Sequence, residues 1–265
     1  MKKSHLKIIE FLKKSIEKDK ISHAYLFKGP ENTGKRKVAL EFAKILGINP
    51  YKFHPDLIII DAPTIEISHI RELIHKLSLF PFKSNFKIAI INNAETMTKE
   101  ASNALLKTLE EPPEKSILIL ITSYPNFLLP TIVSRSQVIN FPHPSISEMK
   151  EEILNDKTYK KSINEILNVL NSDLNKRLLY AENIAKDVSY ANNVLRYWII
   201  FFRDVLFEKI GCQRFMIDNT KNNVSMSYSV RKLRDIILKI KNARLLLMNS
   251  SINSRLVLEN LMLEI

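Results

Sequence analysis

The chain has 265 residues, of which 45% are hydrophobic, a formal net charge of +12 and a sequence pI of about 9.6. This length favours two or three domains. The longest apolar cluster, at residues 198–202, is far shorter than the roughly 20 residues that cross a bilayer, so no membrane span is expected. The single cysteine, Cys212, excludes an internal disulfide and a cysteine-based zinc site.

The N-terminus and the charge give weaker indications of location and partners. Residues 1–7 lack the apolar run of a secretory signal, and we expect a cytoplasmic protein. An excess of positive charge is typical of proteins that act near nucleic acid. The chain is also rich in Lys, Ile and Asn, and an AT-rich coding bias explains the excess equally well. The lysines are dispersed along the chain, so the sequence alone identifies no DNA-binding stripe.

From residue 23 to about residue 143, short apolar runs alternate with longer segments of helical periodicity. The runs predict strands at residues 24–27, 57–61, 88–91, 117–121 and 138–141. The segments between them predict helices at residues 35–46, 67–80 and 99–111. Pro81 and Pro112 end the latter two helices. This alternation is typical of an α/β fold with a parallel sheet and crossover helices.

The strand signals stop after Pro144, and residues 145–148 form a capping-box pattern that opens a helical region. We expect helices near residues 146–155, 162–170 and 174–186, then at residues 190–210, 229–248 and 252–265, with a short turn at residues 249–251. The predicted domains are an α/β nucleotide-binding-like domain over 1–143, a small helical lid over 144–185 and an all-α domain over 186–265.

One loop holds two of the chain's four glycines at the spacing of a nucleotide-binding P-loop. It runs Gly29-Pro30-Glu31-Asn32-Thr33-Gly34-Lys35-Arg36 between a predicted strand and a predicted helix. In such loops the glycines let backbone N–H groups surround phosphates, the lysine reaches the terminal phosphates, and a Ser or Thr holds Mg²⁺. Gly29, Gly34 and Lys35 therefore predict a cofactor-binding loop, but Arg36 replaces the hydroxyl.

The second magnesium position is lost as well. P-loop proteins hold the ion through an aspartate that follows a later apolar strand. The best candidate strand is followed by Asn92 and Asn93 instead. The sequence therefore predicts no metal site and no ATP hydrolysis by this chain, and it leaves weak binding of ATP, ADP or phosphate open.

Several stretches together match one protein family. They are residues 22–27, 54–57, 70–73, 103–113 and 129–135. These stretches resemble the clamp-loader subunits of bacterial DNA polymerase III, which belong to the AAA+ ATPase superfamily. The resemblance spans nearly all of residues 20–143, and residues 253–263 resemble the last helix of the family's collar domain. It implies an AAA+ P-loop sheet with helices on both faces, then a helical lid and an all-α collar that joins the subunits.

The family contains motor subunits with intact ATP sites and the delta-prime subunit, a stator whose own site is often degenerate. Arg36 and Asn92 make this chain resemble delta-prime. Ser134 and Arg135 resemble the family's Ser-Arg-Cys motif, whose arginine enters the ATP site of a neighbouring subunit. The resemblance thus implies that Arg135 is an arginine finger in trans. It also implies a hetero-oligomer with gamma/tau-like motor subunits and the delta subunit, which acts on the sliding clamp and, as a complex, on primed DNA.

Four further features are interpreted beside this resemblance. Many relatives insert a four-cysteine zinc module after the P-loop helix, but residues 46–54 contain no cysteine, which predicts no zinc. Glu95 resembles the catalytic glutamate of active relatives and, without a metal, is interpreted as an exposed acid. Thr122 resembles a polar sensing position and is interpreted as a strand cap. From the order of the strands along the chain, we expect Arg135 at the edge of the sheet that is far from the P-loop. The alternative role of Arg135 is an ion pair at a helix end.

The sequence thus predicts a non-catalytic subunit of the DNA polymerase III holoenzyme, with two alternatives. The first is an active clamp-loader ATPase with an unusual metal site, against which Arg36 and Asn92 argue. The second is a basic DNA-binding module on a relic P-loop fold, which predicts tight DNA binding without partners.

Overall fold

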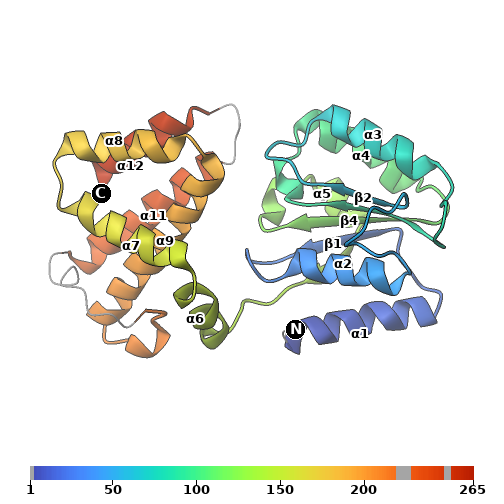
Figure 1. Cartoon of the computed structure of the whole chain (residues 1–265), viewed down its shortest axis with the longest axis horizontal. Coiled ribbons are helices and arrows are strands. Elements are labelled where there is room, and N and C mark those ends of the chain that lie inside the picture. The colour runs from blue at the N-terminus through green and yellow to red at the C-terminus, as the bar shows by residue number, and fades with distance from the viewer. Residues whose placement is uncertain (1–2, 219–227, 248–251) are drawn as a thin grey trace. The chain divides into compact units, whose positions relative to one another are not determined.

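The computed structural model describes residues 3–218, 228–247 and 252–265. The chain divides into two compact units, Met1–His143 and Pro144–Ile265 (Figure 1). The first is an α/β unit and the second is helical. The division falls where the strand signals of the sequence stop.

The first unit is built on one parallel sheet whose strand order is β2-β3-β4-β1-β5. The strands are β1 (Ala24–Lys28), β2 (Leu57–Ile60), β3 (Lys87–Ile91), β4 (Ser116–Thr122) and β5 (Gln137–Asn140). In the centre, Leu26 lies opposite Leu120 on one side and Val138 on the other. The strands are almost continuous apolar runs because helices cover both faces of a parallel sheet. All five predicted strands are confirmed.

Two helical layers cover this sheet (Figure 1). The helices are α1 (Lys3–Glu17), α2 (Lys35–Ile45), α3 (Ile67–Ser78), α4 (Lys99–Glu110) and the short α5 (Pro130–Ser134), with 3-10 turns η1 (Ala94–Thr96) and η2 (Pro125–Phe127). Phe27 packs in one core with Phe42 of α2, and Leu26 packs in the other with Leu105 of α4. The side chains of neighbouring residues in β1 thus pack on opposite faces of the sheet. The sequence analysis predicted α2, α3 and α4 but missed α1 and α5.

The second unit contains the helices predicted for the rest of the chain. They are α6 (Ile146–Leu154), α7 (Lys157–Leu170), α8 (Leu174–Ala185), α9 (Val188–Lys209), α11 (Val230–Leu247) and α12 (Ser254–Glu264), with the 3-10 turn η3 (Gln213–Phe215). Ser145 and Glu148 form the predicted capping box at α6. Asp173 and Asn253 accept hydrogen bonds from first-turn N–H groups of α8 and α12, which satisfies donors that a helix start leaves unpaired. The predicted turn at 249–251 lies outside the described residues.

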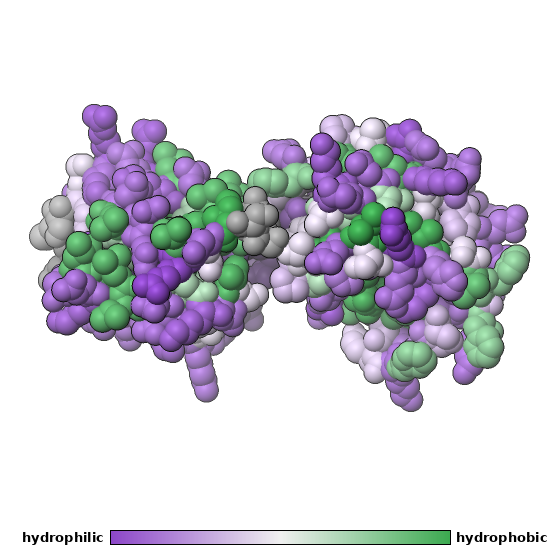
Figure 2. Space-filling model, turned by 90° about the horizontal axis from the view of Figure 1, so that it is seen from above, coloured by the Kyte–Doolittle hydropathy of each residue, from purple (hydrophilic) through white to green (hydrophobic). Residues whose placement is uncertain are grey.

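A single hydrophobic core joins the helices of the second unit. It includes Ile166 of α7, Ala181 of α8, Trp198 of α9 and Leu258 of α12. Residues on both sides of position 185 therefore share one core. The predicted division between a lid domain and an all-α domain at residue 185 stays a prediction. Across the described ranges, no helix combines the length and the hydropathy that a membrane crossing requires. Each unit presents hydrophobic patches between hydrophilic side chains on the face shown in Figure 2.

Candidate nucleotide-binding loop and arginine finger

The P-loop connects β1 to α2, as the sequence predicts. Gly29 has φ of 151° and Gly34, the N-cap of α2, has φ of 78°. Both values lie in the range that favours glycine. A Cβ on Gly29 would stand 2.4 Å from the carbonyl oxygen of Phe141, and one on Gly34 would stand 2.4 Å from Cε1 of His5. Backbone conformation and close packing therefore both require glycine at these two positions.

The ammonium group of Lys35 is bonded within its own chain. Nζ donates to the carbonyl oxygens of Gly29 at 2.8 Å and Pro30 at 2.6 Å, and to Oγ of Ser123 at 3.0 Å. Burial lowers the pKa of Lys35 to about 8, while the charge of Glu95 and then that of a second glutamate act to raise it. An ammonium group has three N–H donors. Lys35 has thus used its full donor capacity, and a phosphate would have to displace one of these oxygens.

The residues at the two magnesium positions do not fit that ion. Nη1 of Arg36 lies 2.8 Å from Oδ2 of Asp61, which directly follows β2. The side chain of Asn92 is buried, and neither its amide nitrogen nor its amide oxygen has a hydrogen-bond partner among the described residues. Mg²⁺ in such sites is held by a hydroxyl and a carboxylate. A guanidinium repels the cation and a neutral amide supplies no charge for it. The described residues hold no cluster of His, Cys, Asp or Glu that could bind a metal.

His5, in the first turn of α1, packs directly on the P-loop. It is buried, and its Nε2 lies 2.6 Å from the carbonyl oxygen of Thr33. Sequence reasoning missed this contact because it assigned no helix to residues 3–17. The available signal was the spacing of His5, Ile9 and Leu12, which places all three on the buried face of one helix.

Glu95 and Thr122 have structural partners near Lys35. Oε1 of Glu95 accepts a hydrogen bond from the backbone N of Ser123 at 3.2 Å, and its Oε2 is buried. The interpretation of Glu95 as an exposed acid is therefore wrong: the turn η1 directs its side chain inward. Oγ1 of Thr122 accepts a hydrogen bond from the backbone N of Tyr124 at 3.0 Å, which is the capping role expected from the sequence.

Arg135 lies at the surface between α5 and β5. Its Nη2 is 2.8 Å from Oε1 of Glu110 in α4, and its Nη1 is 3.3 Å from the carbonyl oxygen of Thr131. The side chain is 37% exposed. Oγ of Ser134 donates to the same carbonyl of Thr131 at 3.1 Å. Ser134 and Arg135 thus lie together, and within this chain Arg135 makes the helix-end ion pair of the alternative interpretation.

The position of Arg135 relative to the P-loop differs from the one expected by chain order. Strand β5 is an edge strand but pairs directly with β1, so the width of the sheet does not separate the two sites. Arg135 precedes β5, whereas Gly29 follows β1. Because the strands are parallel, the two sites lie at opposite ends of neighbouring strands. The structure therefore brings Gly29, Gly34 and Lys35 together and keeps Arg135 apart from them.

Comparison with known proteins identifies the family. A family model described as "DNA polymerase III, delta subunit" matches residues 4–145. Subunit delta-prime of DNA polymerase III from Bacillus subtilis is 30% identical over 231 residues, which cover 80% of this chain and 68% of that protein. Subunit tau from the same organism is 37% identical over 153 residues, which cover 51% of this chain but only 27% of tau.

A solved structure supports the fold. A DNA polymerase III gamma subunit-related protein from Thermotoga maritima has a TM-score of 0.54 and 23% sequence identity, and the match covers 96% of this chain and 97% of that one. This likeness and the five-stranded parallel sheet with helices on both faces confirm the predicted α/β fold followed by a helical region. The chain belongs to the delta-prime family of DNA polymerase III clamp-loader subunits.

Proposed function

We propose that this chain is a stator of the clamp loader, which does not hydrolyse ATP itself and supplies Arg135 to the ATP site of a neighbouring subunit. Its partners in this proposal are gamma/tau-like motor subunits, the delta subunit and the sliding clamp, which the complex loads onto primed DNA. The observation that carries the proposal is the ion pair between Arg36 and Asp61 at the first magnesium position.

The electrostatics of the loop support the absence of hydrolysis. Phosphoryl transfer in P-loop proteins depends on a Mg²⁺ ion that bridges the terminal phosphates and neutralises charge in the transition state. Arg36 places a permanent cation at the ion's first ligand position, and Asn92 removes the carboxylate at the second. The glycine spacing of a P-loop is kept, so binding of a nucleotide or phosphate without hydrolysis, with displacement of one oxygen from Lys35, is compatible with this proposal.

The surroundings of Arg135 support a role in trans. A guanidinium offers planar donors and a permanent charge, which suit a phosphoryl group in transfer. The present ion pair with Glu110 is exposed, with 37% and 51% of the two side chains accessible, and such pairs contribute roughly 0–1 kcal/mol. Exchanging this partner for a phosphate oxygen therefore costs little. Arg135 also lies away from the P-loop of its own chain.

The test is a reconstituted clamp loader that contains Arg135→Ala. We expect the complex to assemble and to lose part of its DNA- and clamp-stimulated ATP hydrolysis and of its clamp loading. Fingers in trans contribute on the order of a thousandfold in GTPases, but only one of several ATP sites is affected here. Arg135→Lys should rescue incompletely, because an ammonium lacks the planar fork.

Glu110→Ala is the matched control, since it breaks the same ion pair but keeps the guanidinium. It should load clamps like the wild type. If an assembled Arg135→Ala complex loads normally, or if Glu110→Ala is equally impaired, Arg135 is not the finger.

The main alternative is an active ATPase, and the similarity to tau does not separate it from the stator. It predicts turnover by the isolated chain at an ordinary rate of about 1 per second or more, abolished by Lys35→Ala. We expect no turnover above background. The second alternative, a DNA-binding module on a relic fold, predicts tight binding of duplex DNA by the chain alone, which a titration of labelled duplex measures.

A further inference from the structure

Two loops of the first unit carry exposed aromatic side chains. Tyr51 and Phe53, in loop 49–56 before β2, are 74% and 96% exposed, and Phe80 and Phe82, in loop 79–86 before β3, are both 76% exposed. Single exposed apolar residues are ordinary, but a group of aromatic side chains on neighbouring loops indicates a binding surface. The proposed roles of Arg135 and the P-loop use none of these residues.

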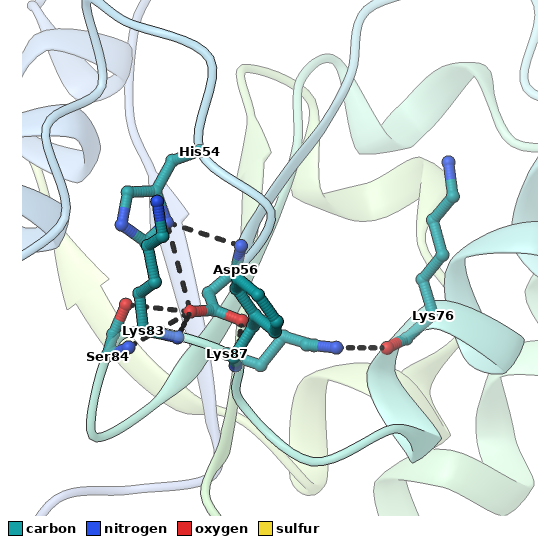
Figure 3. Close-up of polar contacts among 7 residues, drawn as sticks. His54, Asp56, Lys76, Lys83, Ser84 and Lys87 are labelled. Atoms are coloured by element: carbon teal, nitrogen blue, oxygen red, sulfur yellow. Dashed lines mark hydrogen bonds and ion pairs between the residues drawn. The ribbon is translucent and has the colours of Figure 1, made fainter.

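The carboxylate of Asp56 joins the two loops (Figure 3). Its Oδ1 accepts a hydrogen bond from the backbone N of Phe82 at 2.7 Å. Its Oδ2 accepts bonds from the backbone N of Lys83 at 2.8 Å, and from the backbone N and Oγ of Ser84, both at 3.0 Å. Because Asp56 lies only three residues after Phe53, these bonds hold the backbones of the two aromatic-bearing loops beside each other.

Further contacts fix the same loops before any ligand arrives. Nδ1 of His54 accepts a hydrogen bond from the backbone N of Asp56 at 3.2 Å. At the end of the second loop, the buried Lys87 donates to the carbonyl oxygen of Lys76 near the end of α3, at 3.0 Å (Figure 3). Loops that are already ordered lose less conformational entropy on binding.

The exposed charges of the two loops are all positive. Lys52 and Lys83 are exposed, whereas the single acid of the loops, Asp56, is buried and bonded. Nζ of Lys83 lies 5.9 Å from the centre of the Phe82 ring. Within the two loops, exposed aromatic rings and lysines with no exposed acid match the chemistry of single-stranded nucleic acid, whose bases stack on aromatic rings while lysines contact phosphates. Duplex DNA keeps its base faces covered and cannot use the rings in this way.

We propose that loops 49–56 and 79–86 form a binding surface for single-stranded nucleic acid. Phe53 and Phe82 stack on bases, and Lys52 and Lys83 contact the backbone between them. This surface cannot be recognised from the distribution of lysines along the sequence, because only folding brings loops 49–56 and 79–86 together. The proposal is independent of the stator function.

The test measures fluorescence anisotropy of labelled oligothymidylate and oligouridylate, each of roughly 20 nucleotides, with the full chain. Phe53→Ala with Phe82→Ala should weaken binding at least about 25-fold, since stacking on each ring contributes about fivefold or more. Phe127→Ala removes another aromatic side chain, 60% exposed outside these loops, and should bind like the wild type. Phe53→Tyr with Phe82→Tyr keeps both rings and should also retain binding.

The lysines are tested by salt dependence. Lys52→Gln with Lys83→Gln should lower the slope of log K against log salt by roughly 1.4, or 0.7 for each lost phosphate contact. The oligothymidylate and oligouridylate arms compare DNA with RNA, which differ in the sugar and in the 5-methyl group of the base.

Three results would overturn the proposal. The first is wild-type binding by the Phe53→Ala, Phe82→Ala chain that urea unfolding shows to be folded. The second is equal affinity of the wild type for a single strand and a duplex of the same length, which would indicate charge attraction alone. The third is normal DNA binding by the Phe variant together with loss of a subunit from the reconstituted loader, which would assign the loops to a protein partner.

Discussion

At the scale of single residues, the ammonium group of Lys35 bonds to oxygen atoms of its own chain. In a nucleotide-binding P-loop, the same group contacts phosphates. Its three bonds to Gly29, Pro30 and Ser123 connect the P-loop to the residue after β4. Burial nevertheless disfavours the charge, which is why the pKa falls to about 8. The three bonds of Lys35 therefore close the P-loop within the chain. Burial of the ammonium charge costs free energy, and this cost depends on pH.

This cost leads to a prediction about pH. The pKa of Lys35 is about 8 when folded and about 10.4 when unfolded, so the unfolded chain binds more protons between these values. Stability then rises with pH across this window. Relative to Lys35→Met, the wild type should gain about 2 kcal/mol of unfolding free energy between pH 7 and pH 9.5. Urea unfolding of both chains at the two pH values measures this, and a difference that does not change with pH would contradict it.

At the scale of elements, Asp56 connects the two loops that lead into β2 and β3. Burial acts to raise the pKa of its carboxyl group, but the hydrogen bonds from Phe82, Lys83 and Ser84 outweigh burial and hold the pKa below its ordinary value. Asp56 thus stabilises the fold above the unfolded-state pKa of about 4, and this contribution is lost as the pH falls through the lower folded-state pKa.

Asp56→Asn should therefore destabilise the first unit by about 3 kcal/mol at pH 7, since an amide group turns N–H donors toward the N–H donors of loop 79–86. Ser84→Ala is the control, because it removes one of the four bonds and leaves no donor unpaired; it should cost about 1 kcal/mol. Urea unfolding gives both values, and hydrogen exchange should show lost protection at residues 82–84 only in Asp56→Asn. Equal costs for the two variants would refute this role of Asp56.

Local patterns predicted most of the elements, but not the relations between them. The apolar runs located the five strands, and the glycine spacing located the P-loop. The bond between Lys35 and Ser123 joins residues 88 positions apart, which no spacing along the chain encodes. Arg135 lies apart from the P-loop because β5 and β1 are parallel neighbours and the two sites lie at opposite strand ends. Chain order suggested instead that the width of the sheet separates them. Helix α1 was missed although its periodicity was readable.

At the scale of the whole molecule, the two units have separate hydrophobic cores. Every buried residue of the two cores that flank the sheet precedes residue 143, and every buried residue of the helical core follows residue 144. The helical core also extends across residue 185, where the sequence suggested a boundary. The natural place to divide the chain is therefore residue 143.

A chain of residues 1–143 should fold cooperatively without the helical unit and should fail to join the other clamp-loader subunits. A chain of residues 1–185 should instead expose apolar side chains of α7 and α8, since their packing partners α9 and α12 are removed. Circular dichroism during urea unfolding tests the first chain, and binding of a hydrophobic dye compares the two. Stable co-elution of the 1–143 chain with the partner subunits would show that the second unit is not the assembly domain.

The outer strands of the sheet, β2 and β5, are each only four residues long. Exposed strand edges are the sites at which sheet proteins add to one another and aggregate. A four-residue edge offers few backbone groups to a second copy, and the net charge of +12 opposes the approach of identical molecules. The folded chain is thus poorly suited to grow by strand addition, and added salt, which screens the charge, should lower its resistance to aggregation.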